Sequence, residues 1–158
     1  MRIGVISDTH LRGYDEGFKR IADRHFHDVD LVIHAGDLVD MRVLDMFGAK
    51  DVKAVRGNMD PPSVRQALPE SITMRLGGFT VGVAHGWGAS AGLEERLLRL
   101  FGPIDCLIYG HTHAPVNRVR DGVLLFNPGS AVDRRFSLHN SVGILEISDA
   151  IRGEIITL

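Results

Sequence analysis

The chain opens with Arg2-Ile3-Gly4-Val5-Ile6-Ser7-Asp8-Thr9-His10, the stretch that decides its fold class. A short apolar run rich in β-branched residues predicts a buried strand. Here Asp8 and His10 follow closely after the run. In open α/β sheets, ligands bind beyond the carboxyl ends of the strands, where several loops converge. The opening therefore predicts a buried strand that delivers polar side chains to a site.

The same pattern recurs four more times along the chain. Further apolar runs lead to Asp37, Asn58, His85 and His111. Thr separates His111 from His113, just as it separates Asp8 from His10. In extended backbone, residues i and i+2 face the same side, so we expect each of these pairs to present both side chains to one cluster.

Glycine precedes three of these polar residues, as Gly36, Gly57 and Gly110, and is expected to let the chain turn sharply there. The candidate metal ligands comprise two Asp, one Asn and four His: Asp8, His10, Asp37, Asn58, His85, His111 and His113. Seven ligands exceed the needs of one tetrahedral ion but suit two ions that share a carboxylate.

In this order the motifs resemble those of the calcineurin-like metallophosphoesterase superfamily. They are Asp8-Thr9-His10, Gly36-Asp37, Gly57-Asn58-Met59-Asp60, His85-Gly86 and Gly110-His111-Thr112-His113, followed by Asn127-Pro128-Gly129-Ser130. The resemblance runs from residue 3 to about residue 130 and is strongest to the small single-domain bacterial and archaeal phosphodiesterase branch, to which the retromer cargo-binding subunit is related. It implies a four-layer α/β/β/α sandwich of two mixed sheets.

The resemblance also implies the role of each ligand. Asp8, His10 and His113 would hold a first metal, Asn58, His85 and His111 a second, and Asp37 would bridge them. Oxygen ligands combined with imidazoles suit Mn, Fe, Co, Ni or Zn. The implied activity is a dinuclear metal-dependent phosphoesterase, more specifically a phosphodiesterase that hydrolyses small phosphate esters with a metal-bridging hydroxide. Its implied catalytic residues are Asp8, Asp37, Asn58 and His111.

Two positions depart from the wider family. Many members have a His where this chain has Met59, and that His is thought to protonate the leaving group. Met59 has no proton to donate, so activated aryl esters are expected to be the best substrates. Trp87 stands where some relatives have a second His. Specificity is expected to lie in the loops around residues 11–16, 59–68, 86–92 and 130–140.

Less specific interpretations remain open for individual residues. Asp8 or Asp37 alone is more simply a helix cap, Asn58 a turn residue and His85 a core histidine, and only the series favours a metal site. Arg134 and Arg135 could pair with a phosphate at the rim or be a solvated pair. His34 could support the site by a hydrogen bond or simply pack in the core, and Asp60 could orient Asn58 or complete a turn.

Two other functional hypotheses are compatible with the chain. A non-catalytic protein-binding scaffold on the same fold would be favoured by the loss of ligands, and the sequence has lost none. A structural or storage metal protein would not need an open cleft.

Composition is typical of a single cytoplasmic domain over residues 1–158. The net charge of −2 gives no general footprint for duplex nucleic acid. One cysteine, Cys106, excludes an internal disulfide framework, so a reducing compartment is expected. The N-terminal apolar run is too short for a signal peptide, and nothing approaches the apolar length of a membrane span.

Hydrophobic periodicity predicts alternating strands and helices followed by an all-β end. Strands are expected near 2–7, 30–34, 52–56, 71–76, 79–84 and 105–109, with helices near 16–27, 39–48 and 90–101. After residue 114, strands are expected at 116–119, 123–126, 142–147 and 154–158, and Asp121-Gly122 and Arg152-Gly153 are the predicted hairpin turns.

Overall fold

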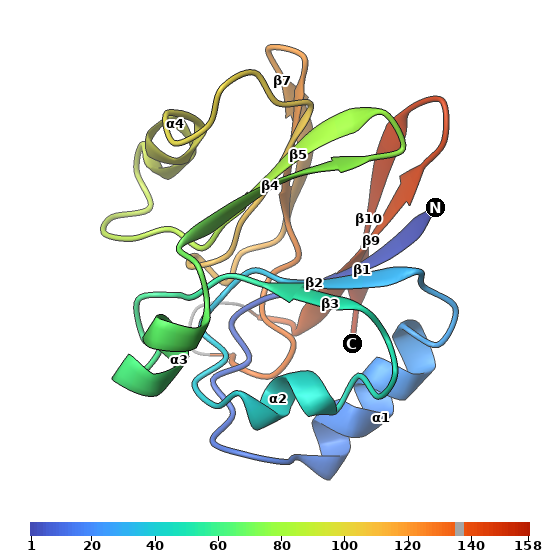
Figure 1. Cartoon of the computed structure of the whole chain (residues 1–158), viewed down its shortest axis with the longest axis vertical. Helices are drawn as coiled ribbons and strands as arrows, with labels where there is room; N and C mark the ends of the chain where they lie inside the picture. Colours follow the sequence, from blue (N-terminus) through green and yellow to red (C-terminus); the bar gives the residue numbers. More distant parts are fainter. Residues whose placement is uncertain (135–137) are drawn as a thin grey trace.

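Two mixed five-stranded sheets form the framework of the protein (Figure 1). A computed structural model describes residues 1–134 and 138–158. The first sheet has the order β10-β9-β1-β2-β3, and the second has the order β4-β5-β6-β8-β7. In each sheet a parallel core carries antiparallel strands at its edge: β1 runs parallel to β2 and β2 to β3, while β5 runs parallel to β6 and β6 to β8.

The strands follow the predicted apolar runs closely. The first sheet contains β1 (Arg2–Ile6), β2 (Leu31–His34), β3 (Val52–Ala54), β9 (Ser141–Ile147) and β10 (Ile151–Thr157). The second contains β4 (Ser71–Leu76), β5 (Phe79–Ala84), β6 (Cys106–Ile108), β7 (Val116–Arg120) and β8 (Val123–Asn127).

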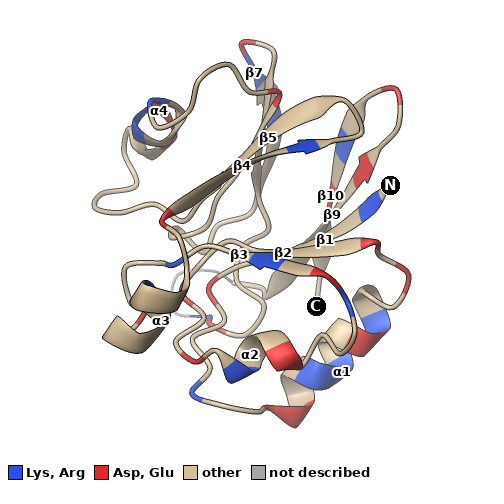
Figure 2. Ribbon diagram, viewed as in Figure 1, with Lys and Arg blue, Asp and Glu red and all other residues tan. Residues whose placement is uncertain are grey.

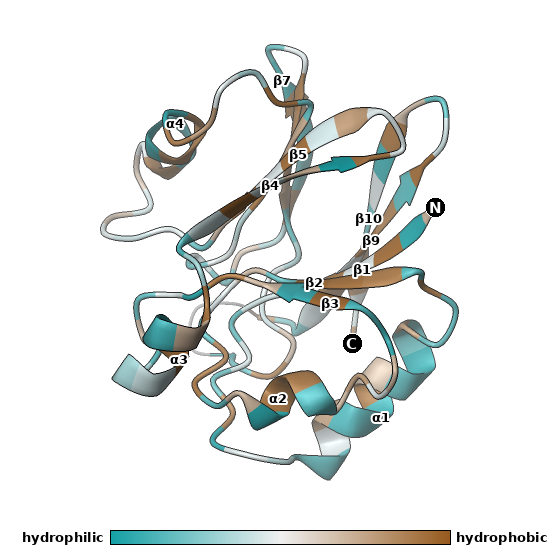
Figure 3. Ribbon diagram, in the orientation of Figure 1, coloured by the Kyte–Doolittle hydropathy of each residue, from teal (hydrophilic) through white to brown (hydrophobic). Residues whose placement is uncertain are grey.

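Alternation along the strands builds the core between the two sheets. In β1, Ile3 and Val5 point into one apolar cluster with Val81 and Val83 of the opposite sheet. Strand residues alternate between faces, so Gly4 lies on the other face of β1. A Cβ at Gly4 would lie 2.6 Å from the Phe26 ring. Because glycine has no side chain, this ring can pack directly against the backbone of β1. Figure 3 shows the hydrophobic residues concentrated in these strands.

Helices cover both outer faces and complete the expected α/β/β/α sandwich. On the first sheet lie α1 (Glu16–His25) and α2 (Arg42–Asp45), which bury Phe18, Ala22 and Val43 against it. On the second lies α4 (Leu93–Leu98), with Leu93 and Leu97 inward. Figure 2 shows acidic and basic residues interspersed along α1, whose first turn carries Glu16 and whose last turn carries Arg24. These charges suit the helix dipole.

Three helices differ from the sequence-based expectations. The helix expected at 39–48 shrinks to α2, because most of the segment bonds from residue i to i+3 in the tighter 3₁₀ manner, as from Phe47 to Leu44. A helix not expected from the sequence, α3 (Pro62–Ala67), begins with Pro62 in its first turn, where a missing N–H costs nothing. The helix expected at 90–101 is confirmed but shorter.

Arg152-Gly153 does not form a hairpin turn. Both residues lie inside β10, where Gly153 pairs with Leu145 of β9. A Cβ at Gly153 would lie 2.6 Å from the Phe126 ring, so this glycine makes room for a core aromatic residue. At the other predicted turn, Asp121 and Gly122 have positive φ of 51° and 80°, as a tight hairpin requires.

Candidate metal centre

The predicted ligands converge where β1, β2, β5 and β6 end (Figure 1). Their backbone is not extended as expected. Five of them have left-handed φ between 50° and 70°: Asp8, His10, Asp37, His111 and His113. Such a conformation costs a non-glycine residue roughly 1–3 kcal/mol and concentrates at functional sites. The i, i+2 pairs therefore converge because the backbone curls around the site.

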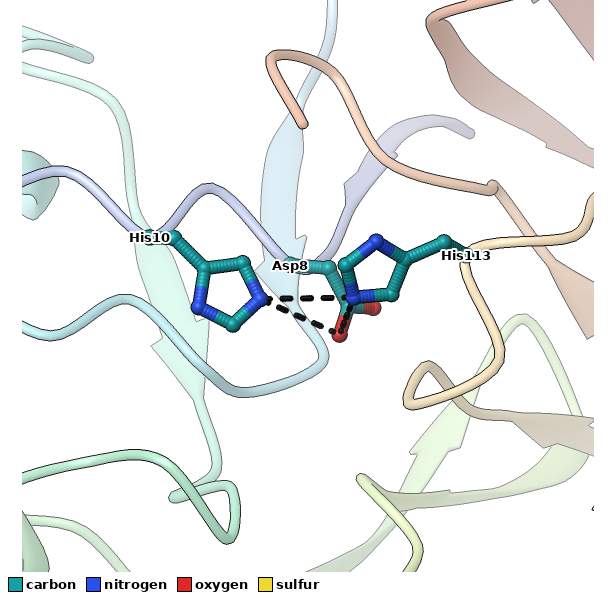
Figure 4. Close-up of side chains that lie close together, drawn as sticks. All are labelled: Asp8, His10 and His113. Carbon is teal, nitrogen blue, oxygen red and sulfur yellow. Dashed lines mark hydrogen bonds and ion pairs between the residues drawn. The ribbon is translucent and has the colours of Figure 1, made fainter. Parts of the chain in front are cut away.

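Asp8, His10 and His113 form a first cluster of potential ligand atoms (Figure 4). Asp8 Oδ1 lies 3.2 Å from His113 Nε2 and 3.9 Å from His10 Nε2. The two imidazole Nε2 atoms are 3.3 Å apart. Figure 4 shows all three side chains turned toward one small space. Residues 103 positions apart in the sequence thus present one oxygen and two nitrogens to a common point.

Asp8 also belongs to a second cluster, with Asp37 and His85. His85 Nε2 lies 3.2 Å from Asp37 Oδ2 and 3.7 Å from Asp8 Oδ1. On the far side of the ring, Nδ1 is 2.7 Å from the carbonyl oxygen of Ala35, to which it donates. A neutral imidazole bonded in this way directs the lone pair of Nε2 at the carboxylates, as a metal-ligating histidine does.

Asn58 and His111 lie together at the rim of these clusters. His111 Nδ1 is 2.9 Å from Asn58 Oδ1, and Nε2 is 2.7 Å from the carbonyl oxygen of Gly88. The amide oxygen of Asn58 and Nδ1 of His111 are both ligand types that suit a divalent transition metal. The centroids of the His85 and His111 rings are 5.6 Å apart, so the three residues of the second predicted ligand set lie near one another.

The buried charged groups of the centre shift one another's pKa values. Burial alone raises the pKa of Asp8, but its interaction with His113 and the charge of His85 outweigh it, so the pKa lies below its usual value. Burial lowers the pKa of His85, but its interaction with Asp37 and the charge of Asp8 raise it to about 9. In the metal-free protein a proton on His85 thus offsets the carboxylate charge.

The glycines before the ligands act through their missing side chains. A Cβ on Gly110 would overlap Ser7 Oγ and lie 2.6 Å from Asp8 Oδ2, and one on Gly57 would overlap Asp37. A Cβ on Gly36 would likewise lie 2.7 Å from His85. Of these three glycines, only Gly36 also has a positive φ, 96°. The sharp turn expected at all three positions is therefore correct for Gly36, whereas Gly57 and Gly110 allow close packing around the carboxylates.

Buried polar residues hold the ligand loops in place. Fully buried His34 accepts the Gly36 N–H on Nδ1 and bonds through Nε2 to Thr9 Oγ1, so it supports two ligand loops. Asp60 accepts the N–H groups of Gly57, Asp37 and Val39. Its role is to organise the loops.

The Asn127-Pro128-Gly129-Ser130 turn borders the site. Its side chains, more than its amides, contact the ligand loops: Ser130 Oγ donates to the Asp8 carbonyl at 2.7 Å, and Asn127 Nδ2 donates to the Gly110 carbonyl at 2.9 Å.

Sequence reasoning missed Asp133. Its Oδ2 lies 3.7 Å from His113 Nδ1 and 3.9 Å from His10 Nε2, facing both histidines of the first cluster. The only signal in the sequence was its place three residues after Ser130. Of the two arginines predicted to bind phosphate, Arg134 is exposed and forms no ion pair with the described residues of the centre. Arg135 lies outside the described residues.

The clusters form one wall of an open cavity of about 590 Å³. Its lining includes His10, Asp37, Asn58, His111 and His113, together with Met59. A small ester can therefore reach the ligand atoms from solvent. Among the described residues, no helix is long and apolar enough to cross a bilayer.

The residues present fit two divalent cations. Asp8 Oδ1 and His85 Nε2 are buried and form no hydrogen bond in the described part of the chain. A buried polar atom without a hydrogen bond is costly, and a cation between these atoms would remove that cost. The mixed carboxylate and imidazole set suits first-row transition metals.

Comparisons with known proteins agree with this geometry. A family model described as the calcineurin-like phosphoesterase superfamily domain matches residues 1–150. A probable metallophosphoesterase of Methanocaldococcus jannaschii is 40% identical, over 100% of this chain and 82% of that protein.

Two solved structures extend the comparison. A structure described as a novel archaeal phosphodiesterase superposes with a TM-score of 0.79 at 28% identity, over 100% of both chains. Zinc-bound Vps29 from Entamoeba histolytica superposes with a TM-score of 0.73 at 25% identity, over 99% of both chains. On the family match and the identity to the Methanocaldococcus protein, the chain belongs to the calcineurin-like phosphoesterase superfamily.

Proposed function

We propose that this protein is a dinuclear metal-dependent phosphodiesterase that hydrolyses small phosphate esters. The observation that carries the proposal is the pair of His/Asp clusters that share buried Asp8 and whose members His10, Asp37 and His113 line an open cavity. The archaeal relative of 28% identity whose structure is described as a phosphodiesterase supports the reaction class. The complete set of seven predicted ligand residues argues against the alternative of a non-catalytic scaffold.

The ligands divide between the two ions. Asp8, His10 and His113 would hold one ion, and Asn58, His85 and His111 the other. Asp37 would contact both ions, and its Oδ2 lies 3.8 Å from His10 Nε2 and 3.2 Å from His85 Nε2, which supports this assignment. When bound, two such ions neutralise phosphate charge and lower the pKa of a coordinated water.

Other groups act on the ligands and on the substrate. Ala35 holds the His85 ring by its carbonyl, and Gly88 holds His111 in the same way. The Met59 N–H donates to Asp37 Oδ1 at 2.7 Å and fixes the orientation of that carboxylate. The Met59 side chain is 58% exposed at the cavity and carries no proton for the leaving group. Esters whose leaving group departs unprotonated, such as nitrophenyl esters, are therefore the best expected substrates.

A metal-reconstitution assay tests the proposal. The protein is chelated, dialysed and assayed with bis(p-nitrophenyl) phosphate before and after addition of Mn, Ni, Co, Fe or Zn. We expect no turnover without metal and recovery with two equivalents of at least one of these ions. Undiminished turnover in a sample free of metal by elemental analysis would refute the metal mechanism. Tight binding of two ions without hydrolysis of any ester would favour the scaffold.

A further inference from the structure

We propose that a second cavity, beside the metal centre, binds the aromatic arm of a phosphodiester substrate. This inference deepens the proposed function and rests on it. The cavity has a volume of about 250 Å³, and its wall includes Arg56, Arg65, Trp87 and Leu100. The occupant we assign is a planar aromatic ring attached to a phosphoryl group, either a simple aryl ester or a nucleoside.

The cavity adjoins the metal centre directly. Asn58 lines both this cavity and the larger one that contains the predicted ligands, and His85 lines its inner end. A phosphate held at the metal centre would thus have a cavity on each side of Asn58. A phosphodiester has two ester arms and can occupy both cavities, whereas a phosphomonoester leaves one empty.

Trp87 provides the apolar surface of the cavity. It follows His85 by two residues, and the flanking Gly86 and Gly88 have positive φ of 114° and 74°. The Arg96 guanidinium donates to the carbonyl oxygens of Trp87 at 3.0 Å and Ala91 at 2.8 Å, so the loop is tied to α4. The indole is nonetheless 40% exposed. A large aromatic surface is thereby held in place beside the ligands and left uncovered.

The charges in the cavity favour an anionic ligand. The Arg56 guanidinium is occupied, because it donates to Glu70 Oε2 at 3.0 Å and to the Arg65 carbonyl at 3.4 Å. The Arg65 guanidinium is exposed and forms no ion pair in the part of the chain that the structure describes. With one Glu and two Arg, the wall carries a net charge of about +1. Arg65 is therefore available to a phosphate oxygen at the mouth of the cavity.

The combination of a held indole and an available guanidinium selects the ligand class. Aromatic rings stack on Trp regardless of their substituents, and a base stacked on an aromatic side chain gains enough affinity for a several-fold effect on binding. A long acyl chain would require a longer apolar channel, and Arg56, Arg65 and Glu70 interrupt this wall. A planar ring next to a phosphate matches both features.

Kinetics with a shared leaving group test the assignment. The metal-loaded enzyme is assayed with p-nitrophenyl phosphodiesters whose other arm is methyl, phenyl or thymidine. We expect a lower KM for the diesters with a phenyl or thymidine arm than for the methyl diester. Comparison of the phenyl and thymidine diesters then shows whether the cavity prefers a simple aryl ester or a nucleoside. Trp87→Ala should raise KM for the diesters with a second aromatic arm by at least about fivefold and should raise KM for the methyl diester less, because the methyl arm cannot stack on the indole. Trp87→Phe should restore most of the loss. An equal effect of Trp87→Ala on all three esters would overturn the assignment.

Fluorescence provides a readout that does not depend on turnover. Trp87 is the only tryptophan of the chain, so its emission reports on this cavity alone. In metal-free protein, phenyl phosphate and thymidine 5′-monophosphate should change the Trp87 emission saturably, whereas methyl phosphate should not. Arg65→Ala should weaken the binding of the two aromatic phosphates in this titration. Arg24→Ala, on the exposed face of α1, is the matched control.

The two measurements separate the inference from the proposed function. No saturable change with any aromatic phosphate would overturn the cavity assignment even in an active enzyme. A saturable change in a protein that hydrolyses no ester with any metal would refute the proposed function and leave the cavity assignment standing.

Discussion

The buried imidazole of His34 contacts the Thr9 hydroxyl, Nε2 to Oγ1, at 3.1 Å. Because Nδ1 of the same ring accepts the Gly36 N–H at 3.2 Å, the ring is neutral with its proton on Nε2, and that proton is donated to Thr9. A second proton, on Nδ1, would point at the Gly36 N–H and break this hydrogen bond. His34 thus joins the loop of Asp8 to the loop of Asp37 only while it is neutral.

Acid should therefore destabilise the protein through His34. Burial, the largest cause, lowers its pKa from 6.5 to about 4. The unfolded state then binds the proton more readily, so stability falls as the pH drops from 6.5 toward 4, by up to about 3 kcal/mol. Urea unfolding of metal-free protein at several pH values should show a shallower acid loss in His34→Gln than in wild type. His27→Gln, at an exposed position, should retain the wild-type slope.

Replacement of Gly110 by Ala should damage both stability and metal binding. The added Cβ would meet Ser7 Oγ and Asp8 Oδ2 in a packed interior. Such overpacking typically costs about 1–3 kcal/mol. Urea unfolding and elemental analysis measure the two effects. Gly102→Ala is the matched control, since a Cβ there meets nothing within 4 Å. Equal behaviour of the two variants would contradict the close packing around Asp8.

Asp37→Asn should reduce the amount of bound metal. The change keeps the shape of the side chain but removes the negative charge that faces His10 and His85. Elemental analysis after exhaustive dialysis should find fewer ions per chain than in Asp45→Asn, whose side chain is exposed on α2. If both variants retain two ions, Asp37 is not the bridge.

Asp133→Asn should weaken metal binding without abolishing it. Asp133 faces His113 on the ring nitrogen opposite the one that faces Asp8, the position of a carboxylate that orients a metal-ligating histidine. Loss of such a partner typically lowers metal affinity by about 10- to 100-fold. Competition with a metal-binding dye measures the affinity, and exposed Asp149→Asn serves as control. An unchanged dissociation constant would assign Asp133 a purely structural role.

Met59→His should improve alkyl esters more than aryl esters. An imidazole at this exposed position on the cavity could protonate the leaving oxygen, with a gain of up to ~10²-fold. A series of esters with increasing leaving-group pKa should show a steep rate dependence in wild type and a flatter one in the variant. Met41→His, at another exposed methionine, should change nothing. A flat dependence in wild type would mean that another group already supplies the proton.

The sequence by itself determined the strands and the identity of the ligands. Each of the strands β1, β2, β3, β5 and β6 is an apolar run that a polar ligand type follows closely, and both signals are local. Parallel strands bring their carboxyl ends together, so the convergence of the site also followed from the sequence.

Tertiary structure alone decided how the ligands are held. The left-handed backbone at Asp8 and His113 is locally unfavourable, so no propensity predicts it, and long-range contacts such as Ser130 to the Asp8 carbonyl support it. Asp133 meets His10 across more than a hundred residues, a contact without a local signal. Gly153, predicted to form a turn, instead admits the Phe126 ring from the other sheet. These features depend on packing between distant segments, which the spacing of residues along the chain does not encode.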